Sequence, residues 1–286
     1  YYAEGEAKRD AADWAGAMEA FTNARSKKQI TETKYQQAKS LMEAKDYLGA
    51  ATIFITISDY KDVDALLVKD DKMIEATVEV RFAVGNYVTF GSYPQTADGD
   101  DMTAIEWLVL AREGKKALLI SRYGLDAQNY HSEDTAITWQ TCSLRTWLNS
   151  TFLNKAFTAT EQSAILITNV DNSKAQGYYS YSDGGNNTED KVFLLSYAEA
   201  HKYLGITYDG DNKELSVEAT AYAKERGVAT SDDNRILWWL RSPGRVQREA
   251  ILARPVGDIY SSYVYLSMVA VRPALWVDIG AEVFNP

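Results

Sequence analysis

The stretch between Arg245 and Ser267 carries the side chains best suited to contact another molecule. Tyrosine offers a large contact area at a small entropic cost, serine offers adaptable hydrogen bonds, and arginine forms bidentate pairs with carboxylates. The interleaved Tyr260, Ser261, Ser262, Tyr263, Tyr265 and Ser267 therefore have the composition of a binding surface, and Arg245, Arg248 and Arg254 can pair with carboxylates of a partner. The alternative, which the sequence leaves open, is that the tyrosines only cover a solvent-facing sheet.

Charge indicates what such a surface would bind. Residues 238–276 contain five arginines and two acidic residues, so five minus two gives a local +3 within a chain whose net charge is −10. A positive patch on an acidic protein steers acidic or mixed-charge partners toward itself. We expect a protein or glycan ligand, and the acidic composition argues against nucleic acid as the main partner.

Side chains for catalysis are scarce. Cys142 is the only cysteine, and neither of the two histidines, His131 and His201, has a partner at a spacing that would orient it as a base. Asp98–Asp101 and Asp209–Glu214 are acidic, but they lack the spacing of a calcium-binding helical hand and are typical of turns. The sequence therefore predicts a protein that is not an enzyme, with neither a metal site nor a cofactor.

Two apolar segments frame the predicted surface. Trp238–Gly244 is an aromatic strand closed by a Pro-Gly turn, and residues 269–276 form a second buried strand. Between them Gly257-Asp258 predicts a hairpin, and the alternation over 263–268 predicts a half-buried strand with its tyrosines on one face. We expect Arg241 and Arg272 to brace these strands by pairing with carboxylates or backbone carbonyls. The predicted core tryptophans are Trp107, Trp147, Trp238, Trp239 and Trp276.

The residues before Trp238 mix strands with short helices. Residues 104–110 and 116–121 predict a hairpin. Thr158–Glu161 and Ser196–Glu199 both match the capping box, which predicts helix starts near 159 and 197. Further helices are predicted over 143–149 and 219–226, and the polar segment 171–191 is predicted to be a long loop. Together these patterns predict an α+β fold.

The first eighty residues contain a repeat. Positions 33 apart match through pairs such as Tyr2 with Tyr35, Asp13 with Asp46, and Phe21 with Phe54. A helix pair repeated at this period is typical of a tetratricopeptide-like solenoid. We predict helical repeats over 1–80, serving as a stalk or spacer rather than as a peptide-binding groove, followed by a separate domain over 84–286.

Seven ordered motifs carry a resemblance to a known family. GNYVTFGSYPQT, IEWLVL, ALLISRYGLDAQ, TWQTCSLRTWLN, KVFLLS, WWLRSPG and VAVRPALW lie in order between residues 84 and 278. They resemble a bacterial domain family of unknown function that often follows short helical repeats. The last two motifs also resemble the C-type lectin fold of the formylglycine-generating-enzyme kind, in which variable proteins of diversity-generating retroelements carry diversified residues between those two markers.

This resemblance implies a C-type-lectin-like domain with a hypervariable binding surface at 245–267, diversified through adenines in a template copy. The ligand-binding residues that we expect there are Arg245, Val246, Gln247, Arg248, Arg254, Tyr260, Ser261, Ser262, Tyr263, Tyr265 and Ser267. Substitution of the adenines in asparagine-type codons can produce the residue types found at seven positions of this surface, namely Arg245, Val246, Arg248, Arg254, Tyr260, Ser261 and Ser262. It cannot produce Gln247, Glu249 or Met268. Two rivals stay open: a surface carbohydrate-binding module of fixed specificity, and a degenerate enzyme of the formylglycine-generating type. The lone cysteine disfavours the latter, because those enzymes use a cysteine pair.

The sequence contains no apolar run long enough to cross a membrane. The chain begins at Tyr1 rather than at methionine. We therefore expect a trimmed protein whose leader or anchor is missing, and we favour a location at the cell surface or outside the cell.

Overall fold

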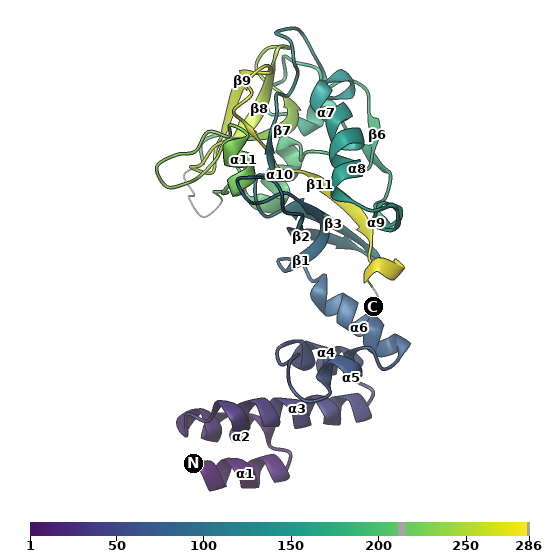
Figure 1. The fold of residues 1–286 in the computed structure, drawn as a ribbon, viewed down its shortest axis with the longest axis vertical. Coiled ribbons are helices and arrows are strands. Elements are labelled where there is room, and N and C mark those ends of the chain that lie inside the picture. Colours follow the sequence, from purple (N-terminus) through teal and green to yellow (C-terminus); the bar gives the residue numbers. More distant parts are fainter. Residues whose placement is uncertain (211–215, 285–286) are drawn as a thin grey trace. The chain divides into compact units, whose positions relative to one another are not determined.

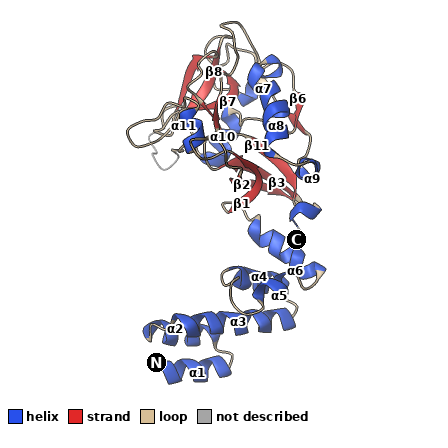
Figure 2. Ribbon diagram, viewed as in Figure 1, coloured by secondary structure: helices blue, strands red, loops and turns tan. Residues whose placement is uncertain are grey.

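The structure, a computed structural model, describes residues 1–210 and 216–284 and divides into two compact units (Figures 1 and 2). One unit joins Tyr1–Ala83 to the residues from Gly280 onward, and we call it the helical unit. The other is Val84–Ile279, which we call the head. The sequence predicted a second domain over 84–286. In the structure the residues from Gly280 onward group with the helical unit instead.

The helical unit is built from two helix pairs followed by two further helices. Within each pair an aspartate accepts a hydrogen bond from the backbone amide three residues later, 3.0 Å for Asp13 to Gly16 and 2.9 Å for Asp46 to Gly49. Each aspartate follows a residue with positive φ, Ala12 or Lys45, which reverses the chain. The helices are α1 Tyr2–Asp10, α2 Trp14–Asn23, α3 Lys27–Glu43, α4 Tyr47–Ile55, α5 Val63–Leu67 and α6 Asp71–Arg81, with a final turn η5 Glu282–Phe284.

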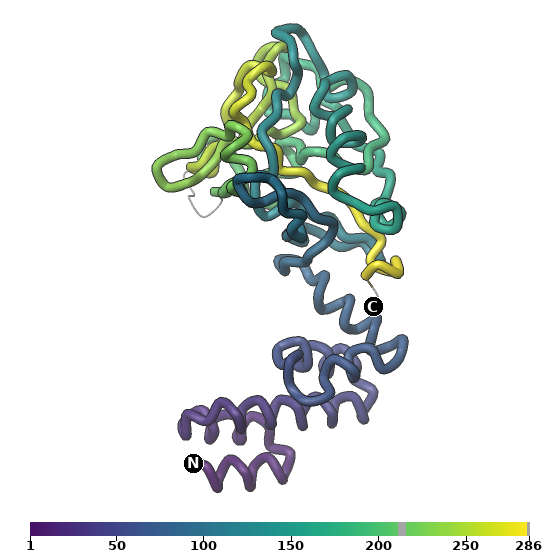
Figure 3. Tube along the Cα trace, viewed as in Figure 1, coloured from purple at the N-terminus to yellow at the C-terminus, as the bar shows by residue number. Residues whose placement is uncertain are grey.

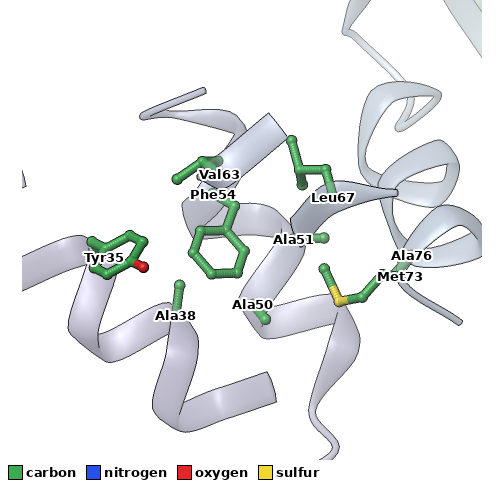
Figure 4. Packing of buried hydrophobic residues seen from close by; sticks show 9 residues of the cluster. All are labelled: Tyr35, Ala38, Ala50, Ala51, Phe54, Val63, Leu67, Met73 and Ala76. Atoms are coloured by element: carbon green, nitrogen blue, oxygen red, sulfur yellow. The ribbon is translucent and has the colours of Figure 1, made fainter. Parts of the chain in front are cut away.

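Small and aromatic side chains form the core of this unit. The Phe54 ring lies among side chains of α3, α4 and α5, at a centroid distance of 6.2 Å from Tyr35 (Figure 4). Ala38, Ala50 and Ala51 are fully buried, which lets the helices approach closely. In the first pair, Tyr2 packs edge-on against Phe21 at 5.7 Å, so the repeated positions make the same contact in both pairs.

The head contains two main sheets. The first has the order β1-β2-β3-β11 and is antiparallel throughout. Its strands are β1 Tyr87–Tyr93, β2 Thr103–Glu113, β3 Lys116–Ser121 and β11 Ala274–Asp278. The β2–β3 hairpin confirms the one predicted over 104–121, and Trp107 and Leu119 are fully buried in it.

The second sheet has the order β4-β10-β7-β8-β9 and therefore ends at β9. Its strands are β4 Asp126–Ala127, β7 Trp238–Pro243, β8 Glu249–Ala253, β9 Ile259–Tyr263 and β10 Ala270–Val271. The predicted hairpin is confirmed, since β8 and β9 are antiparallel and Gly257 adopts φ 84° in the turn between them. The strand predicted over 263–268 is wrong, because β9 ends at Tyr263 and the chain then turns, leaving Met268 exposed.

Short helices and a two-stranded sheet complete the head. Both predicted capping boxes are present, with Thr158 and Glu161 at the start of α9 and Ser196 and Glu199 at the start of α10. The helices are α7 Ser143–Trp147, the π-type turn η2 Leu148–Phe152, α8 Leu153–Ala156, α9 Ala159–Ala164, α10 Tyr197–Leu204 and α11 Ala221–Glu225. The small sheet pairs β5 Thr168–Val170 with β6 Thr188–Asp190, and the 3-10 turns are η1 Trp139–Thr141 and η3 Lys174–Gln176.

Long irregular stretches connect these elements, as the Cα trace shows (Figure 3). One of them is most of the predicted loop over 171–191, which is irregular apart from η3 and β6. The fold is thus mixed α+β, with helices at the N-terminus and sheets in the head. Within the described ranges, none of the helices has both the length and the apolar character needed to cross a membrane.

Candidate ligand-binding surface

Strand β7 supplies the buried frame beneath the predicted surface. Trp238 and Trp239 are buried, and the Trp239 indole nitrogen donates to the Gln128 carbonyl at 3.0 Å. Arg241, buried on the same strand, donates to the carbonyls of Leu194 and Asp171 at 2.9 Å each and pairs with Glu199. The predicted role of Arg241 as a brace is confirmed.

The other frame residues follow the prediction in part. Arg272 is buried and donates from Nε to the Ser121 carbonyl at 2.7 Å, which confirms it as a brace to a backbone carbonyl. Trp107 is fully buried, whereas Trp147 and Trp276 are only half-buried. The core prediction was therefore too strong for these last two, because apolar neighbours in sequence do not guarantee cover on both sides of a strand or helix.

A pocket of ≈ 380 Å³ lies beside the edge strand β9. Tyr260 from β9, Arg254 and Asp258 from the hairpin turn, and Arg245 from the β7–β8 connection form one part of its wall. The other part comes from distant segments, with Tyr179 from the 171–191 loop and the pair Tyr208–Asp209 from the chain after α10. The pocket thus combines tyrosine rings with both cationic and anionic groups.

The arginines of this pocket are already positioned by acidic neighbours. Arg254 forms a two-point ion pair with Asp258, and its guanidinium carbon lies 5.5 Å from the centre of the Tyr260 ring. The hydrogen bond to Asp258 raises the pKa of the Arg254 guanidinium. Arg245 lies 3.4 Å from Glu249 and remains more than half exposed. Both cations are therefore oriented and still accessible to an anionic group.

Ser261 does not lie on the exposed surface where the sequence placed it. Its side chain is 2% exposed, and its hydroxyl donates to Glu249 at 2.6 Å while accepting from the Arg245 amide at 2.8 Å. The close approach of Gly244 to this hydroxyl explains the burial, because a Cβ at Gly244 would lie 2.2 Å from Ser261 Oγ. Ser261 thus holds the β7–β8 connection in place rather than presenting itself to a ligand.

A second group of predicted residues lies at the other end of β9. The rings of Tyr263 and Tyr265 stack at 5.5 Å, and the Arg248 guanidinium carbon lies 5.3 Å from the centre of the Tyr263 ring. Arg248 also lies 3.7 Å from Asp134, and about half of each of these two side chains is exposed. Tyr260 and Tyr263 belong to separate clusters, so the structure does not gather the predicted residues around a single point.

The remaining predicted residues divide between frame and surface. Gln247 donates to the carbonyls of Ile137 and Asp183, 2.8 Å each, and accepts from the Asp183 amide, so its polar atoms are engaged within the chain. Val246 and Ser267 are exposed, and Ser262 is half-buried.

The sequence interpretation missed the tyrosines contributed by other segments. The rings of Tyr178 and Tyr208 stack face to face at 4.5 Å, and each is more than two-fifths exposed. Tyr178 also contacts Tyr179 and Tyr197 edge-on, at 5.0 and 5.3 Å. The available signal was the Tyr-Tyr-Ser-Tyr run at 178–181, inside the segment already predicted to be a long loop.

Cys142 is fully buried at the start of α7, and burial raises the pKa of its thiol to about 12. The described residues contain no group of three His, Cys, Asp or Glu side chains that could hold a metal ion. Of the acidic segment Asp209–Glu214, the residues from 211 onward lie outside those described.

Comparison with known protein families gives a match over most of the head. A family model described as domain of unknown function DUF6273 matches residues 114–279, which is more than half of the 286 residues. The match covers the second strand of the β2–β3 hairpin, the capped helices, the whole β7–β9 sheet region and β11. Searches of curated proteins and of solved structures found no significant match.

Proposed function

We propose, from the premise that this chain belongs to the DUF6273 family, that it is a non-enzymatic ligand-binding protein. Its head would recognise a macromolecular ligand, a protein or a glycan, through the side chains of residues 245–267 that face solvent. The tyrosines of the 171–191 loop and of the segment after α10 would extend this surface. The helical unit would serve as a stalk of tetratricopeptide-like repeats.

One observation carries the proposal: each exposed tyrosine of β9 has an arginine over its ring. Arg254 pairs in this way with Tyr260, and Arg248 with Tyr263. Tyrosine and arginine are the side chains most enriched among residues that dominate binding energy at interfaces. Because the rings hold the guanidinium groups in place, less side-chain entropy is lost when they meet a carboxylate.

The finer proposal is a C-type-lectin-like head whose surface is diversified by a retroelement. The positions of two residues that adenine substitution cannot produce support this proposal, because both residues are built into the frame. Gln247 binds two backbone carbonyls, and Glu249 is buried against Ser261, whereas the permitted Val246, Arg248 and Tyr260 are exposed. Ser261 and Met268 run against the pattern, as the first is permitted but buried and the second is excluded but exposed.

A carbohydrate-binding module of fixed specificity is the second candidate, and the pocket beside β9 favours it. The aromatic rings of Tyr179, Tyr208 and Tyr260 line the same pocket as Asp209 and Asp258. Aromatic faces and carboxylate acceptors are the groups that pack on sugar rings and accept hydrogen bonds from sugar hydroxyls. The two candidates differ in which cluster matters, because this pocket does not include Tyr263 or Arg248.

The test is a screen of the full chain on arrays of bacterial surface proteins and of glycans, in the presence of a chelator. For each ligand found, Tyr263→Ala should mainly speed dissociation, because it removes a desolvated anchor. Arg248→Ala should mainly slow association and weaken its salt dependence, because it removes a steering charge. Matched controls are Tyr1→Ala in the helical unit and Arg122→Ala in the head, because both side chains are exposed and neither belongs to the proposed surface.

The outcomes separate the candidates. Loss of binding in Tyr260→Ala and Tyr208→Ala, with Tyr263→Ala unaffected, would support the fixed carbohydrate site. If every ligand tolerates replacement of all exposed residues between 245 and 267, the proposed surface is not the site. Reading the flanking DNA for a reverse transcriptase and an imperfect copy of the 238–276 coding sequence tests diversification independently of any ligand.

A further inference from the structure

The head contains a second cavity, of ≈ 300 Å³, that the surface described above does not use. Tyr87 of β1, Leu108 of β2 and Leu204 of α10 form apolar parts of its wall. Arg122, Glu218 and Arg272 bring charge to it. The volume is at the lower end of the range for small-molecule sites, and the mixture of an apolar wall with a few polar groups is typical of them.

Arg272 is the unusual member of this wall. The residue is only 5% exposed, and its Nε donates to the Ser121 carbonyl at 2.7 Å, while its guanidinium carbon lies 5.0 Å from the centre of the Trp238 ring. Across residues 1–210 and 216–284, no carboxylate forms an ion pair with it and no other oxygen accepts a hydrogen bond from it. Burial lowers the pKa of Arg272 to about 10, so the group is still charged at neutral pH.

A buried cation with free donors and no counter-ion is unfavourable, and a buried arginine is usually compensated by a planar anion. Brace contacts alone do not compensate Arg272, because the Ser121 carbonyl and the Trp238 ring are both neutral. The second cation of the cavity, Arg122, already has a carboxylate partner. Arg122 is paired with Glu106 at 3.1 Å and lies 4.8 Å from the centre of the Tyr87 ring. Among the described residues, Arg272 is therefore the buried cation of this cavity that has no carboxylate partner.

We propose that this cavity binds a small organic acid, with the carboxylate on the free face of the Arg272 guanidinium and the apolar body against Tyr87, Leu108 and Leu204. The apolar wall is the reason for an organic acid rather than inorganic phosphate. Arg122 adds long-range attraction for the anion, and the exposed Glu218 opposes it. This site is independent of the proposed macromolecular surface, because the two cavities share no wall residue.

The experiment titrates the full chain with benzoate and other monocarboxylates at low salt, by calorimetry and by melting temperature. Benzamide, which has the same shape without the charge, and inorganic phosphate are the reference probes. Saturable benzoate binding with a rise in melting temperature is expected, with benzamide and phosphate giving neither. Arg272→Met should weaken benzoate binding by at least about tenfold, whereas Arg254→Met, at the other pocket, should leave it unchanged.

Two surface variants keep the test valid if Arg272→Met does not fold. Glu218→Gln should tighten benzoate binding and Arg122→Gln should weaken it, each by a few-fold, because both side chains reach solvent and are not part of the core. Equal binding of benzoate and benzamide would overturn the proposal. So would benzoate affinity unchanged in all three variants, or the absence of saturable binding by every acid up to millimolar concentration.

Discussion

Arg241 Nη2 donates to Glu199 Oε1 at 3.1 Å, and this ion pair joins the tryptophan-rich strand β7 to the start of α10. The same carboxylate accepts the Ser196 amide at 2.9 Å, as the capping box requires. One glutamate therefore caps a helix and neutralises an arginine whose side chain is 1% exposed. A local sequence motif thus also stabilises the sheet beneath the proposed binding surface.

Removal of this carboxylate should be costly. Glu199→Ala leaves Arg241 charged and buried, and breaking one partner of a buried pair costs roughly 3–5 kcal/mol. We expect that loss in the free energy of unfolding, measured by denaturant titration of the full chain. The matched control is Glu161→Ala, which removes the equivalent glutamate from the other capping box; this carboxylate also accepts the Gly91 amide at 3.2 Å, but among the described residues it has no arginine partner. That variant should lose about 1 kcal/mol, and equal losses in the two would contradict the dual role.

The frame and the surface should respond differently to truncation. Trp239 is fully buried and bonded to the Gln128 carbonyl, so Trp239→Ala should cost roughly 3–5 kcal/mol as a core cavity. Tyr260 is 49% exposed, so Tyr260→Ala should change stability by less than about 1 kcal/mol. A melting series on the two variants decides this. If Tyr260→Ala were the more destabilising change, the assignment of Trp239 to the core and of Tyr260 to the surface would be wrong.

The head should fold without the helical unit. Val84–Ile279 is a compact unit with its own buried sheets, and the Ile279 amide bonds within it to the Lys115 carbonyl at 2.8 Å. A fragment of residues 84–279 should therefore unfold cooperatively by calorimetry, with near-ultraviolet circular dichroism showing ordered tryptophans. An 84–286 fragment is the control for the last residues. Recovery of both fragments only as aggregates would show that the head needs the helical unit.

The helical unit should weaken in acid through Glu32. Burial of this carboxylate acts to raise its pKa, but hydrogen bonds from Lys61, Tyr60 and Gln36 outweigh it and lower the pKa of Glu32 to about 2. Because the folded-state pKa lies below the ordinary value of 4.5, the stabilisation is complete above that pH and is lost as the pH falls toward 2. Helical circular dichroism during urea unfolding at several pH values measures it.

In the Glu32→Gln variant this part of the acid dependence should disappear, together with the stabilisation at neutral pH. Glu43→Gln, which changes an exposed glutamate of the same helix, should follow the wild-type curve. Identical acid dependence in wild type and Glu32→Gln would show that the Lys61 and Tyr60 contacts do not stabilise the unit.

Several features were predictable because neighbouring residues determine them. A capping box needs only a hydroxyl and a glutamate three residues apart, so Ser196 and Glu199 define the start of α10 by themselves. The β8–β9 turn needs only a residue that tolerates positive φ, which Gly257 supplies. The repeated Asp13 and Asp46 mark equivalent helix starts for the same local reason.

The proposed binding surface, in contrast, depends on tertiary contacts. Alternation after Tyr263 predicted a strand, but alternation cannot tell whether a neighbouring strand exists, and β9 lies at the sheet edge and ends there. Ser261 carries a polar side chain suited to a surface, yet Gly244 and Glu249 close over it. Burial depends on which distant segments approach a side chain, and local sequence does not encode that approach.

The same reason explains why the sequence pointed to residues of the surface without defining either cavity. It identified Arg245, Arg254 and Tyr260 by residue type alone. Only the fold brings Tyr179 and Tyr208 to them, across gaps of more than thirty residues in the chain. Arg272 was correctly predicted to be a brace from its apolar neighbours. That its remaining donors lack a counter-ion among the described residues depends on which side chains the folded sheets place around it, which is a property of the tertiary structure.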